Sequence, residues 1–142
     1  STLHTNDAPS AITRLTDMGV ENYLTTSSLV AVLAQRLVRL ICPRCKVSDG
    51  VRTTPEGATV ACWRGAGCED CFGGGFKGRV GIFEMMELNE EIRHLIMRNS
   101  DASEIAAAAR RNGMRTLRED GWQKVESGVT TAGEVMRVTQ EF

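Results

Sequence analysis

Four cysteines, arranged as two Cys-x-x-Cys pairs, are the residues of this chain whose spacing points most directly to chemistry. The pairs are Cys42–Cys45 and Cys68–Cys71, and 22 residues separate them. A Cys-x-x-Cys turn aims both sulfurs at one point, so two such turns can supply the four thiolates of a tetrahedral Zn²⁺ site. Such a site leaves no coordination position for a substrate. The spacing therefore predicts a structural zinc site at Cys42, Cys45, Cys68 and Cys71.

Three other interpretations of the cysteines fit the sequence less well. Disulfide bonds form in oxidising compartments, whereas the chain shows no signal peptide and has an odd fifth cysteine, Cys62. An iron–sulfur cluster commonly groups three cysteines tightly together, and a redox Cys-x-x-Cys belongs in a βαβ context that this sequence lacks. Cys62 lies in an apolar, strand-like run, so we expect a small buried residue and not a fifth ligand.

Size and charge limit the class of protein. With 142 residues, the chain has room for one modest domain or for a core with a small metal-binding lobe. Its net charge of −1 and pI near 6.1 argue against a general nucleic-acid binder, which would be basic. The best candidate for a membrane span, residues 29–41, is interrupted by Gln35, Arg36 and Arg39. We therefore expect a soluble, cytoplasmic protein that does not bind nucleic acid.

The order of helix and strand signals divides the chain into three segments, 1–41, 42–88 and 89–142. The first is expected to contain a strand over residues 1–5, then a helix with Asp7 as its N-cap and Gly19 after its end. A longer helix is predicted over residues 26–41, because its apolar residues share one face at helical spacing: Leu29, Val30, Leu33, Leu37 and Leu40.

The second segment is the predicted zinc lobe, with short strands near residues 51–53, 59–63 and 79–86. The third segment is predicted to be helical. Its helix boundaries are marked by capping residues and glycines: Asn89, Asp101 or Ser103, Gly113, Gly128, and the capping-box pair Thr131 and Glu134.

The glycine-rich run over residues 73–78 matches the letters of a nucleotide-binding fingerprint but not its context. That fingerprint requires a strand before it and a helix after it, whereas here a predicted metal knuckle precedes the run and a strand follows. Arg79 and Val80 also stand where a P-loop needs Lys and Ser or Thr. The glycines are therefore predicted to wrap the zinc knuckle, where positive φ angles are often needed.

His4 is the one histidine in a setting typical of a functional residue. It precedes a predicted helix N-terminus, which favours anions, and lies beside Thr5, Asn6 and Asp7. A lone histidine is nevertheless more often structural or exposed than catalytic. The other histidine, His94, lies within a predicted helix and is expected at the surface.

Several motifs together resemble those of the secretion and pilus ATPases, and the resemblance covers essentially the whole chain. Residues 1–19 resemble that family's histidine box, with Leu-His-Thr-Asn-Asp-Ala at its centre. Residues 34–39, followed by Cys-Pro-x-Cys-Lys, are similar to the segment that leads into its zinc-binding region. The remaining matches are Gly67-Cys68-x-x-Cys71, Gly78-Arg79-x-Gly81-Ile82-x-Glu84, Leu117-Arg118-x-Asp120-Gly121 and Glu134-Val135-Met136-Arg137-Val138-Thr139.

The resemblance implies both a fold and a function. The fold would be an α/β fragment of a RecA-like ATPase core over residues 1–41, a four-cysteine zinc-binding lobe over 42–88 and a helical C-terminal cap over 89–142. The chain looks closest to the type II secretion ATPases, and the alternative is the type IV pilus assembly ATPases. The implied protein is a homo-hexameric motor on the cytoplasmic face of the bacterial inner membrane. Its implied partners are an inner-membrane platform protein and the cytoplasmic domain of a membrane-anchored secretion component.

Within that resemblance, His4 would lie near the γ-phosphate and orient the attacking water, and Arg14 would support the histidine box or the phosphate charge. The chain departs from the family because it contains no Walker A, no acidic Walker B and no aspartate box. We therefore expect the C-terminal part of a longer ATPase that uses ATP and Mg²⁺, with no appreciable turnover by this part alone. A free-standing zinc-ribbon adaptor is the alternative from another class, but an adaptor has no use for the histidine box.

Overall fold

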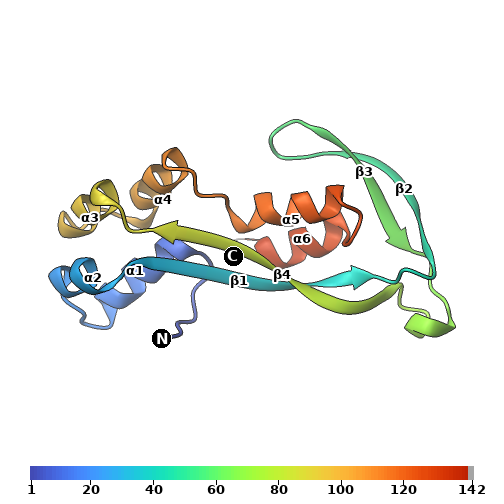
Figure 1. Cartoon of the computed structure of the whole chain (residues 1–142), viewed down its shortest axis with the longest axis horizontal. Coiled ribbons are helices and arrows are strands. Elements are labelled where there is room, and N and C mark those ends of the chain that lie inside the picture. Colours follow the sequence, from blue (N-terminus) through green and yellow to red (C-terminus); the bar gives the residue numbers. More distant parts are fainter. Residues whose placement is uncertain (141–142) are drawn as a thin grey trace. The chain divides into compact units, whose positions relative to one another are not determined.

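The computed structural model describes residues 1–140. These residues form two compact units. Unit 1 contains residues 1–35 and 83–116, whereas unit 2 contains residues 36–82 and 117–140 of the described chain. The strands β1 (Ala31–Ile41) and β4 (Phe76–Glu87) pair with each other, and each contributes residues to both units (Figure 1). With six α-helices and two two-stranded sheets, residues 1–140 form a small α/β fold.

Unit 1 contains four helices together with residues 31–35 of β1 and 83–87 of β4. The helices are α1 (Ala8–Asp17), α2 (Asn22–Ser28), α3 (Glu90–Met97) and α4 (Ala102–Arg111). Helix α1 packs on α2 and α4, and α3 packs on the same two helices. Helices α1, α3 and α4 each turn an apolar stripe inward, whereas the buried residue of α2 is Thr25. The buried isoleucines of those three helices are Ile12, Ile92, Ile96 and Ile105.

The predicted helix boundaries in unit 1 are confirmed by their capping contacts. The Asp7 carboxylate accepts a hydrogen bond of 2.8 Å from the Ser10 N–H at the start of α1. Gly19 follows the end of that helix with a φ of +88°, in the left-handed region that favours glycine. Asn89 and Asp101 cap α3 and α4 in the same way as Asp7 caps α1.

Two secondary-structure predictions for residues 1–41 are wrong. Residues 1–5 form no strand, because a strand needs a partner and the structure pairs no described segment with them. Residues 26–41 do not form one helix: α2 ends at Ser28, and β1 begins at Ala31. The apolar stripe that suggested a helix is largely solvent-exposed, with Leu33 at 60% and Leu37 at 46%, while alternate residues such as Ala34 and Val38 are buried. Pairing with β4 overrides the local helical pattern.

Unit 2 is built on an antiparallel hairpin covered by two helices. Strands β2 (Lys46–Thr53) and β3 (Thr59–Gly65) pair from Lys46 opposite Gly65 to Thr53 opposite Thr59, with an irregularity between Ser48 and Val51. Helix α5 (Leu117–Glu126) packs on β3 and on α6 (Ala132–Thr139), as Figure 1 shows. Their buried side chains form one core: Val60, Cys62, Trp122, Val125, Ala132 and Val135.

A buried carboxylate ties α6 to β1. The Glu134 side chain, 3% exposed, accepts bonds of 2.8 Å from the Arg39 N–H and 2.7 Å from the Arg39 guanidinium. It also accepts two bonds, of 3.0 and 3.1 Å, from Arg137. Thr131 caps α6 by accepting from the Glu134 N–H at 3.1 Å. Thr131 therefore caps the helix as the predicted capping box requires. The Glu134 carboxylate accepts hydrogen bonds from Arg39 and Arg137.

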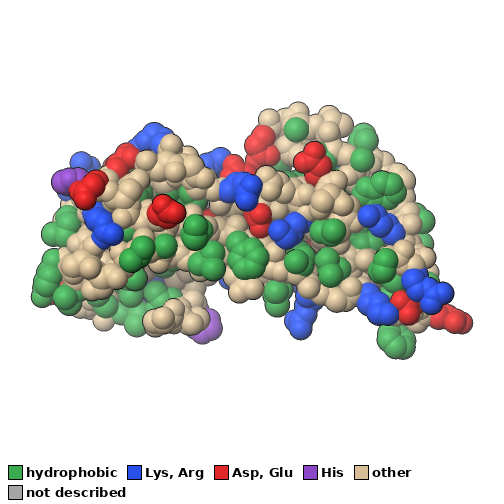
Figure 2. Space-filling model, viewed as in Figure 1, with side chains coloured by type: hydrophobic (Ala, Val, Ile, Leu, Met, Phe, Trp, Pro, Cys, Tyr) green, Lys and Arg blue, Asp and Glu red, His purple; other side chains and the backbone are tan. Residues whose placement is uncertain are grey.

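No helix among residues 1–140 is long and apolar enough to cross a membrane. On the face shown in Figure 2, acidic and basic side chains are interspersed and do not gather into a patch of one sign. This distribution agrees with the net charge of −1.

Candidate metal centre

Four cysteines from two connections, β1–β2 and β3–β4, meet at one end of the β2–β3 hairpin in unit 2. Cys42 directly follows β1, and Cys45 directly precedes β2. Cys68 and Cys71 bracket a single 3₁₀ turn (Glu69–Cys71), which leads through three glycines into β4. The hairpin therefore brings together two pairs that lie far apart in the sequence.

The sulfur atoms have the separations that a tetrahedral metal site requires. The Cys42–Cys68, Cys45–Cys71 and Cys68–Cys71 Sγ atoms are each 3.8 Å apart, and all four sulfurs lie within 4.8 Å of one another. A regular tetrahedron with Zn–S bonds of about 2.3 Å has edges of about 3.8 Å. A disulfide would need a separation of about 2.05 Å, so these cysteines are not disulfide-bonded. The donor set fits a zinc ion.

Backbone N–H groups point at two of the sulfurs. Gly67 donates to Cys45 Sγ at 3.3 Å, and Cys68 and Gly75 donate to Cys71 Sγ at 3.3 and 3.2 Å. Although burial raises the pKa of the Cys71 thiol, the N–H groups of Cys68 and Gly75 outweigh it and lower that pKa to about 6. At Cys45, burial outweighs the Gly67 N–H and raises the pKa to about 11. Such outer hydrogen bonds hold thiolates in place for a metal.

The glycines around the cysteines let two stretches of backbone touch. A Cβ atom at Gly65 would lie 2.0 Å from the Gly75 carbonyl oxygen, so no side chain fits there. The same oxygen accepts a 2.9 Å hydrogen bond from the Cys42 N–H. Gly67 has a φ of +97°, and a Cβ there would lie 2.7 Å from the Gly73 oxygen. The glycine-rich run therefore shapes the knuckle and continues into a strand, as predicted, which is not the arrangement of a phosphate-binding loop.

Cys62 takes no part in the cluster. It lies in β3, is 2% exposed and belongs to the core of unit 2, as the sequence predicted. A cluster of four thiolates closes the coordination sphere of zinc, so the bound ion has no open position at which to activate water. The arrangement can stabilise the fold of unit 2.

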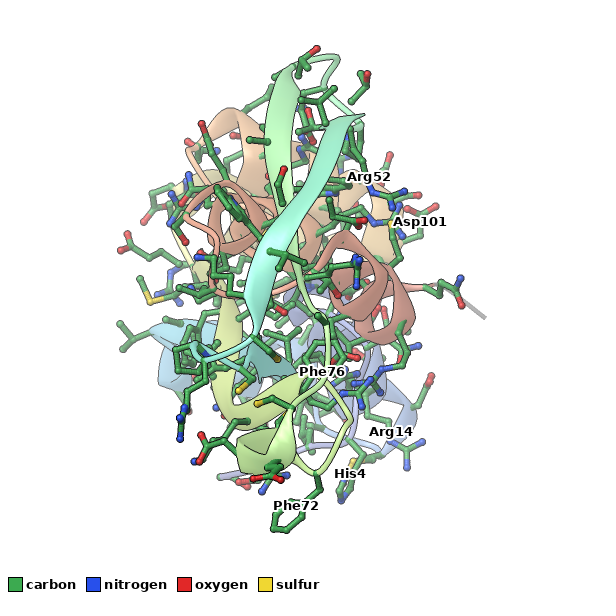
Figure 3. The ribbon with its side chains drawn as sticks, turned by 90° about the vertical axis from the view of Figure 1, so that its right-hand side faces the viewer. His4, Arg14, Arg52, Phe72, Phe76 and Asp101 are labelled. Carbon is green, nitrogen blue, oxygen red and sulfur yellow. The ribbon has the colours of Figure 1, made fainter. Side chains whose placement is uncertain are left out.

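The two candidate catalytic residues lie in unit 1, and the structure does not test their predicted roles. His4 is exposed in the irregular segment before α1, and Arg14 is exposed on α1 itself. No hydrogen bond or ion pair joins them among residues 1–140. His94 is exposed on α3, as predicted. Figure 3 shows the positions of His4 and Arg14.

The sequence placed Glu84 and Glu134 in family motifs, but did not predict that both are buried carboxylates with defined partners. Glu134 bonds Arg39 and Arg137, and Glu84 accepts a 2.8 Å hydrogen bond from the Ala8 N–H. The capping-box pattern predicted Glu134 at the start of a helix, and gave no indication that its carboxylate would bond Arg39. Nothing local marked Glu84 as buried, because its partner is 76 residues away.

The sequence of this chain is similar to those of known secretion and pilus proteins. The family model described as type II/IV secretion system protein matches residues 1–137. The chain is 47% identical to a type IV pilus assembly ATPase, PilB, of Thermus thermophilus, with 99% of the chain and 17% of that protein aligned. It is 46% identical to the type II secretion system protein HxcR of Pseudomonas aeruginosa, over 99% of the chain and 28% of that protein. It is 42% identical to the type II secretion system ATPase E of Vibrio cholerae, over 99% of the chain and 29% of that protein.

The helices and the two two-stranded sheets make this a small α/β protein, and the four-cysteine cluster gives it a candidate metal-binding lobe. The match over nearly its whole length shows more: the chain belongs to the type II/IV secretion system protein family. It spans between 17% and 29% of the length of the relatives named above.

Proposed function

We propose that this chain forms part of a motor ATPase that powers type II protein secretion. The observation that carries the proposal is the similarity over 99% of the chain to proteins named as ATPases, at 47% identity for a type IV pilus assembly ATPase and 42% for a type II secretion system ATPase. Type IV pilus assembly is the second candidate, supported by the 47% identity to the Thermus thermophilus pilus assembly ATPase. Membership of this family favours either function over that of a free-standing zinc-ribbon adaptor.

In the proposed motor, this chain contributes the histidine box of a RecA-like core but not the phosphate-binding loop. Its 142 residues contain no Walker A or Walker B sequence, so ATP and Mg²⁺ would be held mainly by another part of the protein. His4, exposed before the N-terminus of α1, would hydrogen-bond near the reacting phosphate. Arg14 would support the negative charge there, as arginines do in phosphoryl transfer.

The four-cysteine lobe would serve the motor as a structural element, with zinc bound by Cys42, Cys45, Cys68 and Cys71. Since a closed thiolate site cannot activate water, its contribution would be to hold unit 2 in shape. The lobe would pass motion of the core to neighbouring subunits of a hexamer or to membrane partners. Those partners would be an inner-membrane platform protein and the cytoplasmic domain of a membrane-anchored secretion component, which would bring the motor to the inner membrane.

The test compares two histidine variants in the full-length protein that carries this chain. His4→Ala is expected to lower ATP turnover roughly tenfold or more while nucleotide affinity changes less than about twofold, because the contact is made mainly in the transition state. His94→Ala is the matched control, since this exposed histidine on α3 should leave turnover unchanged. Normal turnover in assembled His4→Ala protein would contradict the role of His4. Complementation of strains lacking the secretion or the pilus ATPase separates the two candidate systems.

A further inference from the structure

Glu84 is a buried carboxylate that anchors the start of α1. It lies on β4 and is 4% exposed, whereas its neighbour Met85 is 53% exposed. Its Oε1 atom accepts a 2.8 Å hydrogen bond from the Ala8 N–H, which belongs to the first residue of α1 and is itself fully buried. The bond joins residues 76 positions apart within unit 1.

The contact completes the hydrogen bonding of the first turn of α1. An α-helix leaves its first N–H groups without partners inside the helix. In α1 the Ala8 N–H donates to Glu84, Pro9 has no N–H, and the Ser10 N–H donates to Asp7. Because Ala8 is fully buried, water cannot readily replace Glu84 as the acceptor. A negative carboxylate at this end is also favoured by the helix dipole.

Fixing this turn also fixes the segment that carries His4. Only three residues separate His4 from Ala8. Within that segment the Thr5 hydroxyl donates a 3.1 Å hydrogen bond to the Asp7 carbonyl oxygen, which links it to the N-cap of α1. The buried residues Ala11 and Ile12 hold the body of the helix in unit 1, whereas Glu84 holds its first backbone N–H.

We propose that Glu84 is a positioning residue for His4. By accepting from the Ala8 N–H, it sets where α1 begins and therefore where the segment before it places the imidazole. This inference rests on the proposed function, in which His4 acts near the reacting phosphate. Glu84 itself touches no reactant in this account, and it acts through the backbone of residues 4–8.

A double-mutant cycle in the full-length protein tests the proposal. Glu84→Met replaces the carboxylate with an apolar side chain of similar length and is expected to lower kcat roughly tenfold, with the KM for ATP within about twofold. Glu84→Gln keeps an acceptor oxygen and should retain kcat within about threefold. In the His4→Ala background, Glu84→Met should lower kcat no further, because both changes remove the same contribution. Glu87→Ala, an exposed glutamate on the same strand, is the matched control.

The outcomes separate this inference from the proposed function. Multiplicative losses from Glu84→Met and His4→Ala would mean that Glu84 supports the fold but not His4, and would overturn the inference. If His4→Ala lowers turnover while Glu84→Met does not, the inference fails and the proposed function stands. If His4→Ala has no effect, both fail.

A second measurement on the unmodified chain does not depend on any variant folding. The first N–H groups of a helix usually exchange rapidly with solvent, because they have no partner inside the helix. The Ala8 N–H is expected to exchange at least about 100-fold more slowly than an unstructured amide, as a buried, hydrogen-bonded group should. Exchange of Ala8 at the unstructured rate would also overturn the inference.

Discussion

Replacing Glu134 tests how strongly one buried carboxylate holds unit 2 together. Burial raises the pKa of Glu134, but the hydrogen bonds from Arg39 and Arg137 outweigh it and lower the pKa from 4.5 to about 2. A depression of that size corresponds to about 3 kcal/mol of stability at neutral pH. The arginine side chains are 51% and 56% exposed, so water screens the interaction. We therefore expect Glu134→Gln to destabilise unit 2 by about 2 kcal/mol at pH 7.

Urea unfolding followed by tryptophan fluorescence measures this change directly. Both tryptophans of the chain, Trp63 and Trp122, belong to unit 2, so the signal reports the unit that contains Glu134. With an m-value of about 1.5 kcal/mol/M, the unfolding midpoint should fall by roughly 1.3 M. Glu126→Gln, which changes an exposed glutamate on α5, should leave the midpoint unchanged. Equal midpoints for the wild type and Glu134→Gln would refute the reasoning.

The stability that Glu134 contributes to unit 2 should decrease as the pH falls. The folded-state pKa of Glu134 is depressed, so its contribution is fully present above the unfolded-state value of 4.5 and is lost as the pH falls towards about 2. The difference in stability between wild type and Glu134→Gln should therefore shrink over that range. Acid also releases metal from thiolates, but it does so in both proteins, and the comparison at each pH removes this shared loss. A difference that stays constant from pH 5 to about pH 2 would contradict the linkage.

Further predictions concern backbone positions in unit 2, each measured by the same unfolding assay. Phe72 is 98% exposed and has a φ of +55°, in the left-handed region that favours glycine. Phe72→Gly should therefore stabilise unit 2 by about 0.5 kcal/mol, whereas Phe72→Ala should give no gain in stability. An equal gain from both variants would exclude backbone strain at Phe72 as the cause. The Phe72 ring projects away from the ribbon in Figure 3, so little packing is lost. Gly121→Ala should destabilise by about 1–3 kcal/mol, because its Cβ would lie 2.5 Å from a Val135 methyl group. Gly133→Ala, whose Cβ has no neighbour closer than 3.8 Å, should stabilise by about 0.5 kcal/mol; a loss at both glycines would exclude crowding at Gly121 as the cause.

The sequence predicts best those features that depend on neighbouring residues. Three helices have an N-cap that the sequence predicts, because the capping side chain accepts a hydrogen bond from the backbone N–H three residues further along the chain. These N-caps are Asp7, Asn89 and Asp101. The four-cysteine cluster is equally predictable, because a Cys-x-x-Cys turn and a closed tetrahedral site together define its ligands. The motifs that indicated a secretion or pilus ATPase are likewise confirmed by the family match.

The features that the sequence could not predict depend on partners far along the chain. Leu33 and Leu37 lie at helical spacing, but the segment that contains them pairs as a strand with residues 76–87. No local signal indicates that pairing, which places these leucines on the exposed side of β1. The same holds for Glu84, whose burial depends on α1 lying against β4.

Metal analysis of the purified chain tests the central claim, that four cysteines form one structural zinc site, most directly. The sulfur separations of 3.8 Å predict one zinc ion per chain, bound by Cys42, Cys45, Cys68 and Cys71. Cys68→Ser should lose the metal and destabilise unit 2, because binding and folding are coupled. Cys62→Ser should keep it, since Cys62 lies in the core of unit 2. Full zinc retention in Cys68→Ser, or loss of zinc in Cys62→Ser, would contradict the account.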